Sequence, residues 1–334
     1  MVRSTVPVGF TRSEILPALS EILGAVLDEG FFLTACPERT LTGKAIHELA
    51  SLPQLVGGSP ASLAKGLPFL ESCGFSCIPL EGFEAAELGK AICNLSRLTQ
   101  FNLANFFGLC CERFGIQGND LLRTLMTHYP RLQLPMPGTG VGGSCLPKDS
   151  LVLFDGLTGE EGVWSFPREQ YLANEKIIAH VTQAVIDFAR LNTSRPILAL
   201  GIAFKGIPPT DDTRNSVGLR IVQSLMHSSM DVRVCDLRVQ ASSVTSLGLQ
   251  PATLPIHLDA YSAILLLNND PGYLELLHSV LAPRTPGTIG LYDPWRLLLS
   301  DSPTVFARAL PLDHLYELLQ RHLQLQDLDM SLKG

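Results

Sequence analysis

Apolar residues recur at helical spacing through the middle of this chain. Over residues 84–115, 118–129 and 168–192 they return every three to four positions, which places them on one side of an α-helix. These stretches predict three long helices within a helical region that runs from about residue 82 to residue 190.

Beyond residue 193 the pattern changes to short, unbroken apolar runs with helical stretches between them. Such runs, bounded by turn residues, are typical of strands that are buried on both faces of a sheet. Strands that alternate with helices favour a parallel, doubly wound sheet, so we assign the chain to the α/β class. The predicted strands lie at 197–200, 232–235, 263–267 and 288–292.

The two ends of the chain carry weaker signals. Residues 1–80 mix short apolar runs with proline and glycine and contain a helical pattern from Ile15 to Leu27, which indicates the remnant of an α/β domain. Residues 310–332 are leucine-rich and amphipathic, which predicts a docked terminal helix. The expected domains are 1–80, the helical region 81–192, the sheet domain 193–300 and a helical tail 301–334.

The composition of the 334 residues narrows the range of functions. A formal net charge of -7 argues against non-specific binding to nucleic acid, which needs a basic face. The eight cysteines lack the paired spacing of a zinc site, so we expect reduced thiols and no metal. The N-terminus has no signal-peptide pattern and polar residues interrupt the apolar stretch 98–111, so we expect a cytoplasmic protein without a membrane span.

The segment Pro137–Asp149 is a glycine-dense loop that presents one cysteine beside a lysine and an aspartate. Four of the six residues 138–143 are glycine, which a chain tolerates mainly where the backbone turns tightly or approaches a ligand. Cys145 at the end of such a loop is well placed to act as a nucleophile. The simpler interpretation is a turn that carries a small, buried and inert cysteine.

This loop resembles the catalytic-cysteine loop of the UDP-glucose/GDP-mannose dehydrogenase family, G-x-G-x-G-G-x-C-[LIF]-x-K-D. Further segments resemble elements of that family in the same order: Ser4–Thr11, Cys36–Gly43, Ala85–Asn94 and Gly201–Ser216. The resemblance implies a Rossmann-like N-terminal part that is truncated, a central helical dimerisation region and a C-terminal UDP-sugar-binding domain.

The resemblance also implies a reaction. An NAD-dependent member would oxidise the C6 hydroxyl of a UDP-sugar to a carboxylate in two hydride transfers, for polysaccharide biosynthesis. Cys145 would attack the intermediate aldehyde, and the thiohemiacetal would become a thioester that water releases. The match assigns an oxyanion site to Lys90 and Asn94, the ordering of water and of the lysine to Asp149, and the role of base to Glu38.

Lys90 and Asn94 are four residues apart, so their side chains share one face of the predicted helix. A cation and an amide at this spacing can hold an oxyanion, while a solvated lysine with a polar neighbour is the simpler interpretation. Asp149 and Glu38 could likewise be carboxylates that cap turns. Asn105 lies near the same helix face, where relatives often have Asn-Glu and this chain has Asn-Phe.

Binding contacts follow from the same resemblance. Arg131 resembles an arginine that reaches the substrate of a neighbouring subunit, which implies a homodimer. Substrate contacts are expected at Arg131, Gly138, Gly140, Gly142, Phe204 and Lys205, and NAD contacts at Ser4, Thr5, Val6, Lys148 and Arg214.

The motifs point to two different sugars. The segments 37–39 and 128–131 resemble dehydrogenases of N-acetylhexosamines, whereas residues 144–149 are closer to the glucose enzymes. Thr42 stands where glucose-specific relatives have glutamate. We therefore favour a UDP-N-acetylhexosamine over UDP-glucose as the substrate.

The start of the chain departs from the family. Members open with a βαβ unit whose G-x-G-x-x-G turn binds the NAD pyrophosphate, and this sequence has no such opening. A start codon placed too late, a separate NAD-binding polypeptide and a loss of the redox reaction all stay open. The protein is then either a dehydrogenase completed by that segment or a catalytically silent protein that binds UDP-sugar or dimerises. In both cases we expect UDP-sugar to bind and NAD to bind weakly.

Overall fold

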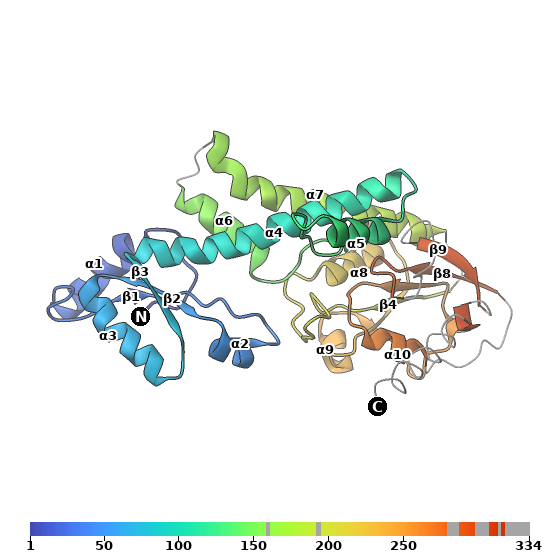
Figure 1. Ribbon diagram of the computed structural model, residues 1–334. Coiled ribbons are helices and arrows are strands. Elements are labelled where there is room, and N and C mark those ends of the chain that lie inside the picture. The colour runs from blue at the N-terminus through green and yellow to red at the C-terminus, as the bar shows by residue number, and fades with distance from the viewer. Residues whose placement is uncertain (158–160, 192–194, 279–286, 298–306, 313–314, 318–334) are drawn as a thin grey trace, which may run out of the picture. The chain divides into compact units, whose positions relative to one another are not determined.

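The computed structural model describes residues 1–157, 161–191, 195–278, 287–297, 307–312 and 315–317 (Figure 1). The chain forms two compact units. Residues 1–99 and 144–173 make the first unit, and residues 100–143 and 174–334 make the second unit. The chain passes between the units within the long helices α4 (Phe83–Arg113) and α7 (Phe166–Arg190) and within the glycine-dense loop, between Gly143 and Ser144.

The two units differ in their elements. Besides its parts of α4 and α7, the first unit contains η1 (Thr11–Ile15), α1 (Leu16–Leu23), β1 (Thr34–Ala35), α2 (Ala45–Ser51), β2 (Gln54–Gly58), α3 (Pro60–Ser72), β3 (Cys77–Glu81), α6 (Leu146–Gly156) and η2 (Gly162–Ser165). The second unit adds α5 (Gly118–His128), β4 (Ile197–Leu200), α8 (Val217–His227), β5 (Val232–Cys235), α9 (Ala241–Ser246), β6 (Gln250–Pro251), η3 (Leu258–Ala260), β7 (Ala263–Leu266), α10 (Gly272–His278), β8 (Thr288–Tyr292) and β9 (Ala307–Pro311).

The first unit is built on a small sheet in the order β1-β2-β3. Strands β2 and β3 are parallel, β1 is antiparallel to β2, and Val2 forms a parallel bridge with Ala35. The periodic pattern predicts a helix as far as Leu27, but α1 ends at Leu23. Gly24 is left-handed there, with φ 58°, and its N–H bonds back into the last turn, as is common at helix C-termini.

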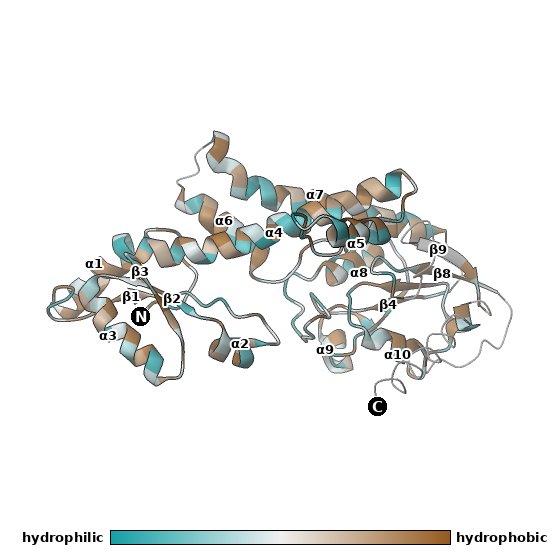
Figure 2. Ribbon diagram, in the orientation of Figure 1, coloured by the Kyte–Doolittle hydropathy of each residue, from teal (hydrophilic) through white to brown (hydrophobic). Residues whose placement is uncertain are grey.

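The second unit is built on a six-stranded sheet in the order β6-β5-β4-β7-β8-β9. All pairs are parallel except β8 with β9. Along β4, Ile197 and Ala199 pack with α7 and α8, whereas Leu198 and Leu200 pack with α10 on the opposite face. Figure 1 shows α8 and α10 on opposite sides of β4, and Figure 2 shows these strands in hydrophobic colours. The predicted doubly wound parallel sheet is therefore confirmed.

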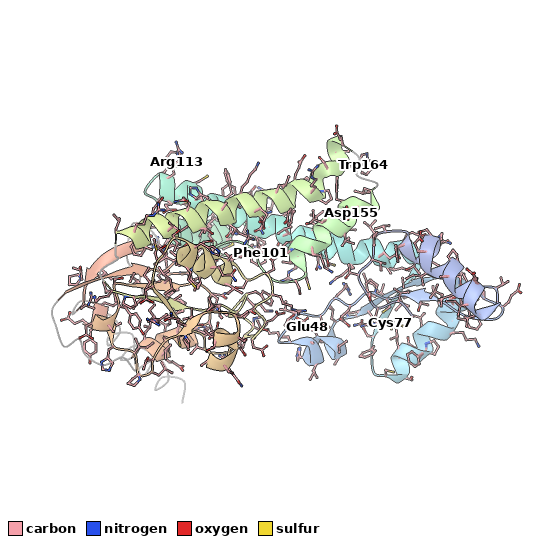
Figure 3. The ribbon with its side chains drawn as sticks, turned by 180° about the vertical axis from the view of Figure 1, so that it is seen from behind. Glu48, Cys77, Phe101, Arg113, Asp155 and Trp164 are labelled. Atoms are coloured by element: carbon pink, nitrogen blue, oxygen red, sulfur yellow. The ribbon has the colours of Figure 1, made fainter. Side chains whose placement is uncertain are left out.

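The predicted long helices are also present, as α4, α5 and α7. In the described part of the chain, none of the helices has both the length and the apolar run that a membrane crossing requires. Just before α7, Trp164 is 51% exposed and its side chain projects away from the ribbon (Figure 3).

The prediction for the C-terminal tail needs a correction. Leu310 lies in β9, which pairs antiparallel with β8, and not in a terminal helix. The pairing places Leu310 opposite Ile289 in the core, so a buried strand position, and not the face of an amphipathic helix, accounts for its burial. Residues 312 and 315–317 are helical, as predicted, and residues 313–314 and 318–332 of the predicted helix lie outside the described residues.

Candidate active site

Cys145 is the N-cap residue of α6, which begins directly after it with Leu146 and Pro147. Proline is favoured in a first helical turn because no N–H is needed there. The thiol is exposed, with its Sγ 3.6 Å from the Ser144 Oγ, so the interpretation as a buried and inert cysteine does not describe it. The unpaired N–H groups of a first turn favour negative charge, which suits a site of nucleophilic attack.

A buried polar cluster lies one helical turn beyond Cys145. The backbone N–H of Asp149 donates to the Cys145 carbonyl over 2.8 Å, which places both residues on the same side of α6. Asp149 is 3% exposed, and its Oδ2 accepts a hydrogen bond from the Asn94 amide over 2.5 Å. The ammonium groups of Lys90 and Lys148 lie 4.0 and 3.2 Å from its carboxylate oxygens.

This cluster brings together residues that the sequence had placed in two motifs. Lys90 and Asn94 are 7% and 6% exposed on one face of α4, so the interpretation as a solvated lysine does not describe this pair. Asp149 reaches them from α6 and balances the charge of the buried ammonium. The geometry lets a carboxylate hold a cation and an amide in fixed positions, as an oxyanion site requires.

Glu38 is bound by the two residues that follow it in the chain and by Arg3. Its carboxylate accepts hydrogen bonds from the backbone N–H groups of Arg39 and Thr40, each over 2.8 Å, and forms an ion pair with Arg3. Burial alone would raise the pKa of Glu38, but the Thr40 and Arg39 N–H groups and the Arg3 guanidinium outweigh it and lower the pKa. The carboxyl is therefore ionised at neutral pH, and it caps a turn as the simpler interpretation expects.

Three asparagines hold the glycine-dense loop within the second unit. The Asn105 Oδ1 accepts a hydrogen bond from Gly138 N–H over 2.8 Å. The buried Asn174 amide bonds both the N–H and the C=O of Val141, each over 2.9 Å. The Asn215 Nδ2 donates to the Gly143 carbonyl over 3.1 Å.

The contacts of Asn174 and Asn215 with this loop were not predicted from the sequence. A signal for Asn174 was available, because it is a lone polar residue on the apolar stripe of α7 that continues with Ile177, Ile178 and Val181. An amide on such a stripe needs buried partners, and the backbone of the loop provides them.

Two glycines show why the loop excludes side chains. Gly140 has φ +118°, and a Cβ there would lie 2.4 Å from the Ile178 Cγ1. A Cβ on Gly143, at φ +85°, would lie 2.8 Å from the ring of Phe204. The loop therefore packs directly against Phe204, which joins two separate sequence motifs.

Phe204 and Lys205 lie in the loop that follows β4. The Phe204 N–H donates to the Asp212 carbonyl over 2.9 Å, and the Lys205 ammonium lies 5.2 Å from the Phe204 ring centre. Arg214 is exposed and bonds the Asp212 carboxylate through two nitrogens, which holds the pKa of that carboxyl below its usual value. A cavity of about 470 Å³ is lined in part by Asp211 and Thr213 from this motif.

The other predicted contacts have local partners or lie on the surface. Arg131 is exposed and stacks on the Tyr129 ring at 4.7 Å. Ser4 is exposed, while Thr5 and Val6 are half-buried. The segment that follows them is bound by the buried Glu87, whose carboxylate accepts the Gly9 and Thr11 N–H groups; we did not predict this role. Among the described residues, no three His, Cys, Asp or Glu side chains are grouped as a metal site.

Comparison with known proteins identifies the family. Residues 84–164 match the central domain, and residues 198–295 the UDP binding domain, of the UDP-glucose/GDP-mannose dehydrogenase family, more than half of the chain together. The chain belongs to this family. The UDP-N-acetyl-D-mannosamine dehydrogenase of Pyrococcus horikoshii is 31% identical over 246 residues, which cover 72% of this chain and 57% of that family member.

Solved structures of the family share the fold. The UDP-D-ManNAc dehydrogenase from Pyrococcus horikoshii gives a TM-score of 0.71 at 26% identity, covering 83% of this chain and 65% of that one. A UDP-glucose dehydrogenase from Pyrobaculum islandicum gives 0.69 at 25% identity, covering 82% and 63%. The chain spans about half the length of the curated family members it matches, 57% and 52% for two of them.

Proposed function

We propose that this chain is the thiol-bearing and UDP-sugar-binding part of an NAD-dependent nucleotide-sugar 6-dehydrogenase. The observation that supports this most directly is the exposed Cys145 at the start of α6, one turn from the buried cluster of Asp149, Lys90 and Asn94. The family membership supports the reaction class, because the matched relatives are named as dehydrogenases of nucleotide sugars.

The proposed reaction has two oxidations joined by a covalent step. The first removes a hydride from C6 and a proton from its hydroxyl, which gives an aldehyde. The Cys145 sulfur then adds to the aldehyde carbon, and the oxyanion of the resulting thiohemiacetal lies beside Lys90 and Asn94. Loss of a second hydride gives a thioester, and attack by water releases the carboxylate and restores the thiol.

NAD would supply the chemistry of accepting each hydride. Of the residues expected to contact NAD, Ser4 and Lys148 lie on the surface of the first unit, which also carries Cys145. These exposed polar groups are suited to contact such a cofactor. The side chain of Arg214, a further expected contact, is 75% exposed.

For the substrate we favour a UDP-N-acetylhexosamine. The residues expected to bind it are Phe204 and Lys205, next to the glycine-dense loop, and Arg131 from the partner in a homodimer. The Pyrococcus horikoshii relative carries the name of a dehydrogenase for an N-acetylated sugar, which supports this choice.

The test compares the wild-type chain with Cys145→Ala and with Cys73→Ala, which removes another exposed thiol of the first unit. NADH formation is followed with UDP-glucose, UDP-N-acetylglucosamine and UDP-N-acetylmannosamine. We expect Cys145→Ala to lose activity on the order of 10³-fold or more, as loss of a covalent nucleophile does, and Cys73→Ala to keep it.

Calorimetry with each UDP-sugar is run on the same samples. Turnover that survives Cys145→Ala would contradict the covalent step. A wild-type chain that binds UDP-sugar without forming NADH would instead favour a silent binding protein, or a dehydrogenase that needs a separate NAD-binding polypeptide. Adding the N-terminal NAD-binding part of a relative distinguishes these two outcomes.

A further inference from the structure

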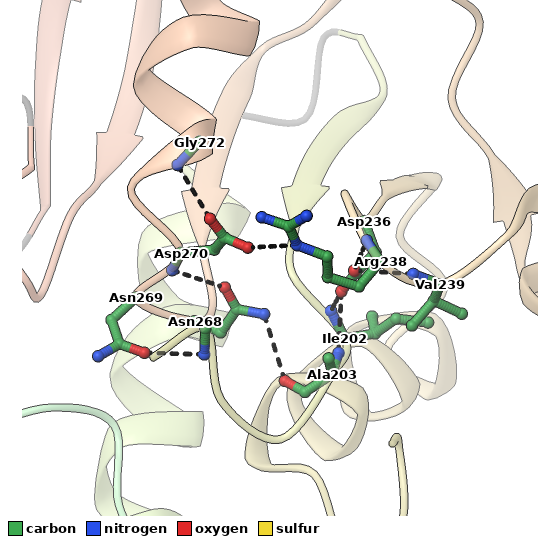
Figure 4. Close-up of polar contacts among 10 residues, drawn as sticks. Ile202, Ala203, Asp236, Arg238, Val239, Asn268, Asn269, Asp270 and Gly272 are labelled. Carbon is green, nitrogen blue, oxygen red and sulfur yellow. Dashed lines mark hydrogen bonds and ion pairs between the residues drawn. The ribbon is translucent and has the colours of Figure 1, made fainter. Parts of the chain in front are cut away.

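The loop 201–206, which carries Phe204 and Lys205, is held by hydrogen bonds to the carboxylate of Asp236. Asp236 follows β5 directly, and its Oδ2 accepts hydrogen bonds from the Ile202 and Ala203 N–H groups over 2.7 and 2.9 Å (Figure 4). Its Oδ1 accepts from the N–H groups of Arg238 and Val239 over 2.8 and 3.1 Å. One side chain thus satisfies four backbone donors of two neighbouring loops.

Side chains that follow β7 hold the rest of the loop. The Asn268 Nδ2 donates to the Ala203 carbonyl over 3.3 Å, and the Asn269 Oδ1 accepts the Gly206 N–H over 2.9 Å. A Cβ on Gly206 would lie 2.0 Å from the Asp270 nitrogen, so the two loops touch backbone to backbone. Both ends of the loop are therefore fixed, on either side of the half-buried Phe204 and Lys205.

An ion pair connects the two groups of contacts. The Arg238 Nε donates to the Asp270 Oδ2 over 2.9 Å, and Asp270 also accepts the Gly272 N–H over 2.9 Å (Figure 4). Asp270 is 3% exposed, so its charge needs this partner. The ends of β5 and β7 are thereby linked across β4, which lies between them in the sheet.

Asp236 lies beside the point where the order of strands in the sheet switches. The chain leaves β4 toward β5 on one side and later returns to β7 on the other, so the order of strands switches at β4. In doubly wound sheets a nucleotide phosphate binds at such a switch, on backbone N–H groups after the first strand. Here the carboxylate of Asp236 already occupies the N–H groups of Ile202 and Ala203.

We infer that Asp236 is a positioning residue for the nucleotide site of the second unit. Its carboxylate occupies the Ile202 and Ala203 N–H groups, where a ligand phosphate would otherwise bind. The ligand is therefore directed to the side chains of Phe204 and Lys205. This inference rests on the proposed function. The carboxylate of Asp236 then stands where a phosphate would otherwise bind. Asp236 affects the affinity for the nucleotide without touching it.

The test removes the carboxylate and then returns it. In Asp236→Ala the N–H groups of Ile202, Ala203, Arg238 and Val239 lose their acceptor, so the loop that carries Phe204 and Lys205 is no longer fixed, and we expect the Kd for UDP to rise about tenfold or more. Formate, a free carboxylate of matching size, should restore at least half of the lost affinity on a logarithmic scale. The matched control is Asp231→Ala, which removes a half-exposed carboxylate from the other end of β5. It should change Kd less than twofold and should not respond to formate.

Amide hydrogen exchange supplies the second readout. The Ile202 and Ala203 amides should exchange faster in Asp236→Ala, and formate should slow them again. If Asp236→Ala fails to fold, Asp236→Asn keeps one acceptor oxygen and should show a smaller loss of affinity with faster exchange at the same amides.

The outcomes separate the two proposals. A wild-type chain that binds UDP, with Asp236 variants of unchanged Kd or without formate rescue, would overturn the positioning role and leave the proposed function intact. In the other case, the wild-type chain does not bind UDP, but protection of the Ile202 and Ala203 amides from exchange still depends on Asp236. This result would overturn the proposed function and the inference that rests on it, although the contact between Asp236 and the loop is real.

Discussion

At the scale of single residues, charge balance explains the candidate active site. Asp149 is buried beside two ammonium groups and one amide, and a charge in such a place is tolerated only when it is paired and hydrogen-bonded. The spacing of Lys90 and Asn94 predicted that they share a helix face. The resemblance predicted that Asp149 orders the lysine, and the structure shows the two side chains 4.0 Å apart, with the role in catalysis still a prediction.

Asp149→Asn should destabilise the chain, because it leaves the buried Lys90 without its counter-charge. Breaking a buried pair is strongly destabilising, and we expect a loss of about 3 kcal/mol in the free energy of unfolding, measured with urea. Asp155→Asn is the control, because Asp155 is an exposed carboxylate on the same helix, α6 (Figure 3). It should change the stability by less than about 0.5 kcal/mol. Equal losses in both variants would contradict a paired Lys90.

At the scale of elements, the glycine-dense loop owes its shape to asparagines on other segments. Asn105 lies on α4, Asn174 on α7 and Asn215 just before α8, and each bonds the loop backbone. A loop without regular structure leaves N–H and C=O groups to be satisfied, and side-chain amides can serve both kinds. Side-chain hydrogen bonds therefore fix the part of this loop that precedes α6, residues 137–145, where no strand or helix is present.

Gly140→Ala should test how closely that loop is packed. The new Cβ would meet the Ile178 side chain at 2.4 Å, in a backbone conformation with φ +118°. Gly248→Ala is the matched control, because Gly248 has φ +75° and no heavy atom within 4 Å of the new Cβ. We expect the control to lose about 1 kcal/mol from backbone strain, and Gly140→Ala to lose about 2 kcal/mol more from overpacking. Thermal and urea unfolding measure both, and equal losses would show that Ile178 moves aside freely.

At the scale of the whole molecule, the two units divide the proposed roles. The first unit holds Cys145 and the buried cluster of Asp149, Lys90 and Asn94. The second unit holds the loop 201–206, which carries Phe204 and Lys205. The matched UDP binding domain, residues 198–295, lies entirely in the second unit. We therefore expect UDP to stabilise the second unit more than the first unit.

UDP alone should stabilise the second unit. A ligand at a hundred times its Kd adds about 2.7 kcal/mol to the stability of the state that binds it. Hydrogen exchange with and without UDP should show new protection in residues 201–216 and 137–143. Uridine, which lacks the phosphates, serves as the control and should protect these segments less. Protection confined to residues 34–81 of the first unit would contradict this assignment.

The sequence by itself determined the long helices, the central strands of the second unit's sheet and the family, but none of the strands β1, β2 and β3 of the first unit. The strands 197–200, 232–235 and 288–292 and the helices α4, α5 and α7 follow from apolar spacing, which local burial imposes on each segment. The cysteine loop carried the resemblance, because its glycines and its thiol stand close together in the chain. Where the signal was short or interrupted, as in β6 and β9, the prediction missed the strand or assigned a helix.

Only the tertiary structure decided which side chains meet. Asn174 reaches Val141 across 33 residues, Asp236 reaches Ile202 across 34, and Asn94 reaches Asp149 across 55. No local period encodes such a contact, because it depends on how strands and helices pack and not on the residues next to it in the chain. The composition of the loops led to the prediction that they are functional, but the partners that fix them became visible only when the sheets and helices had brought distant residues together.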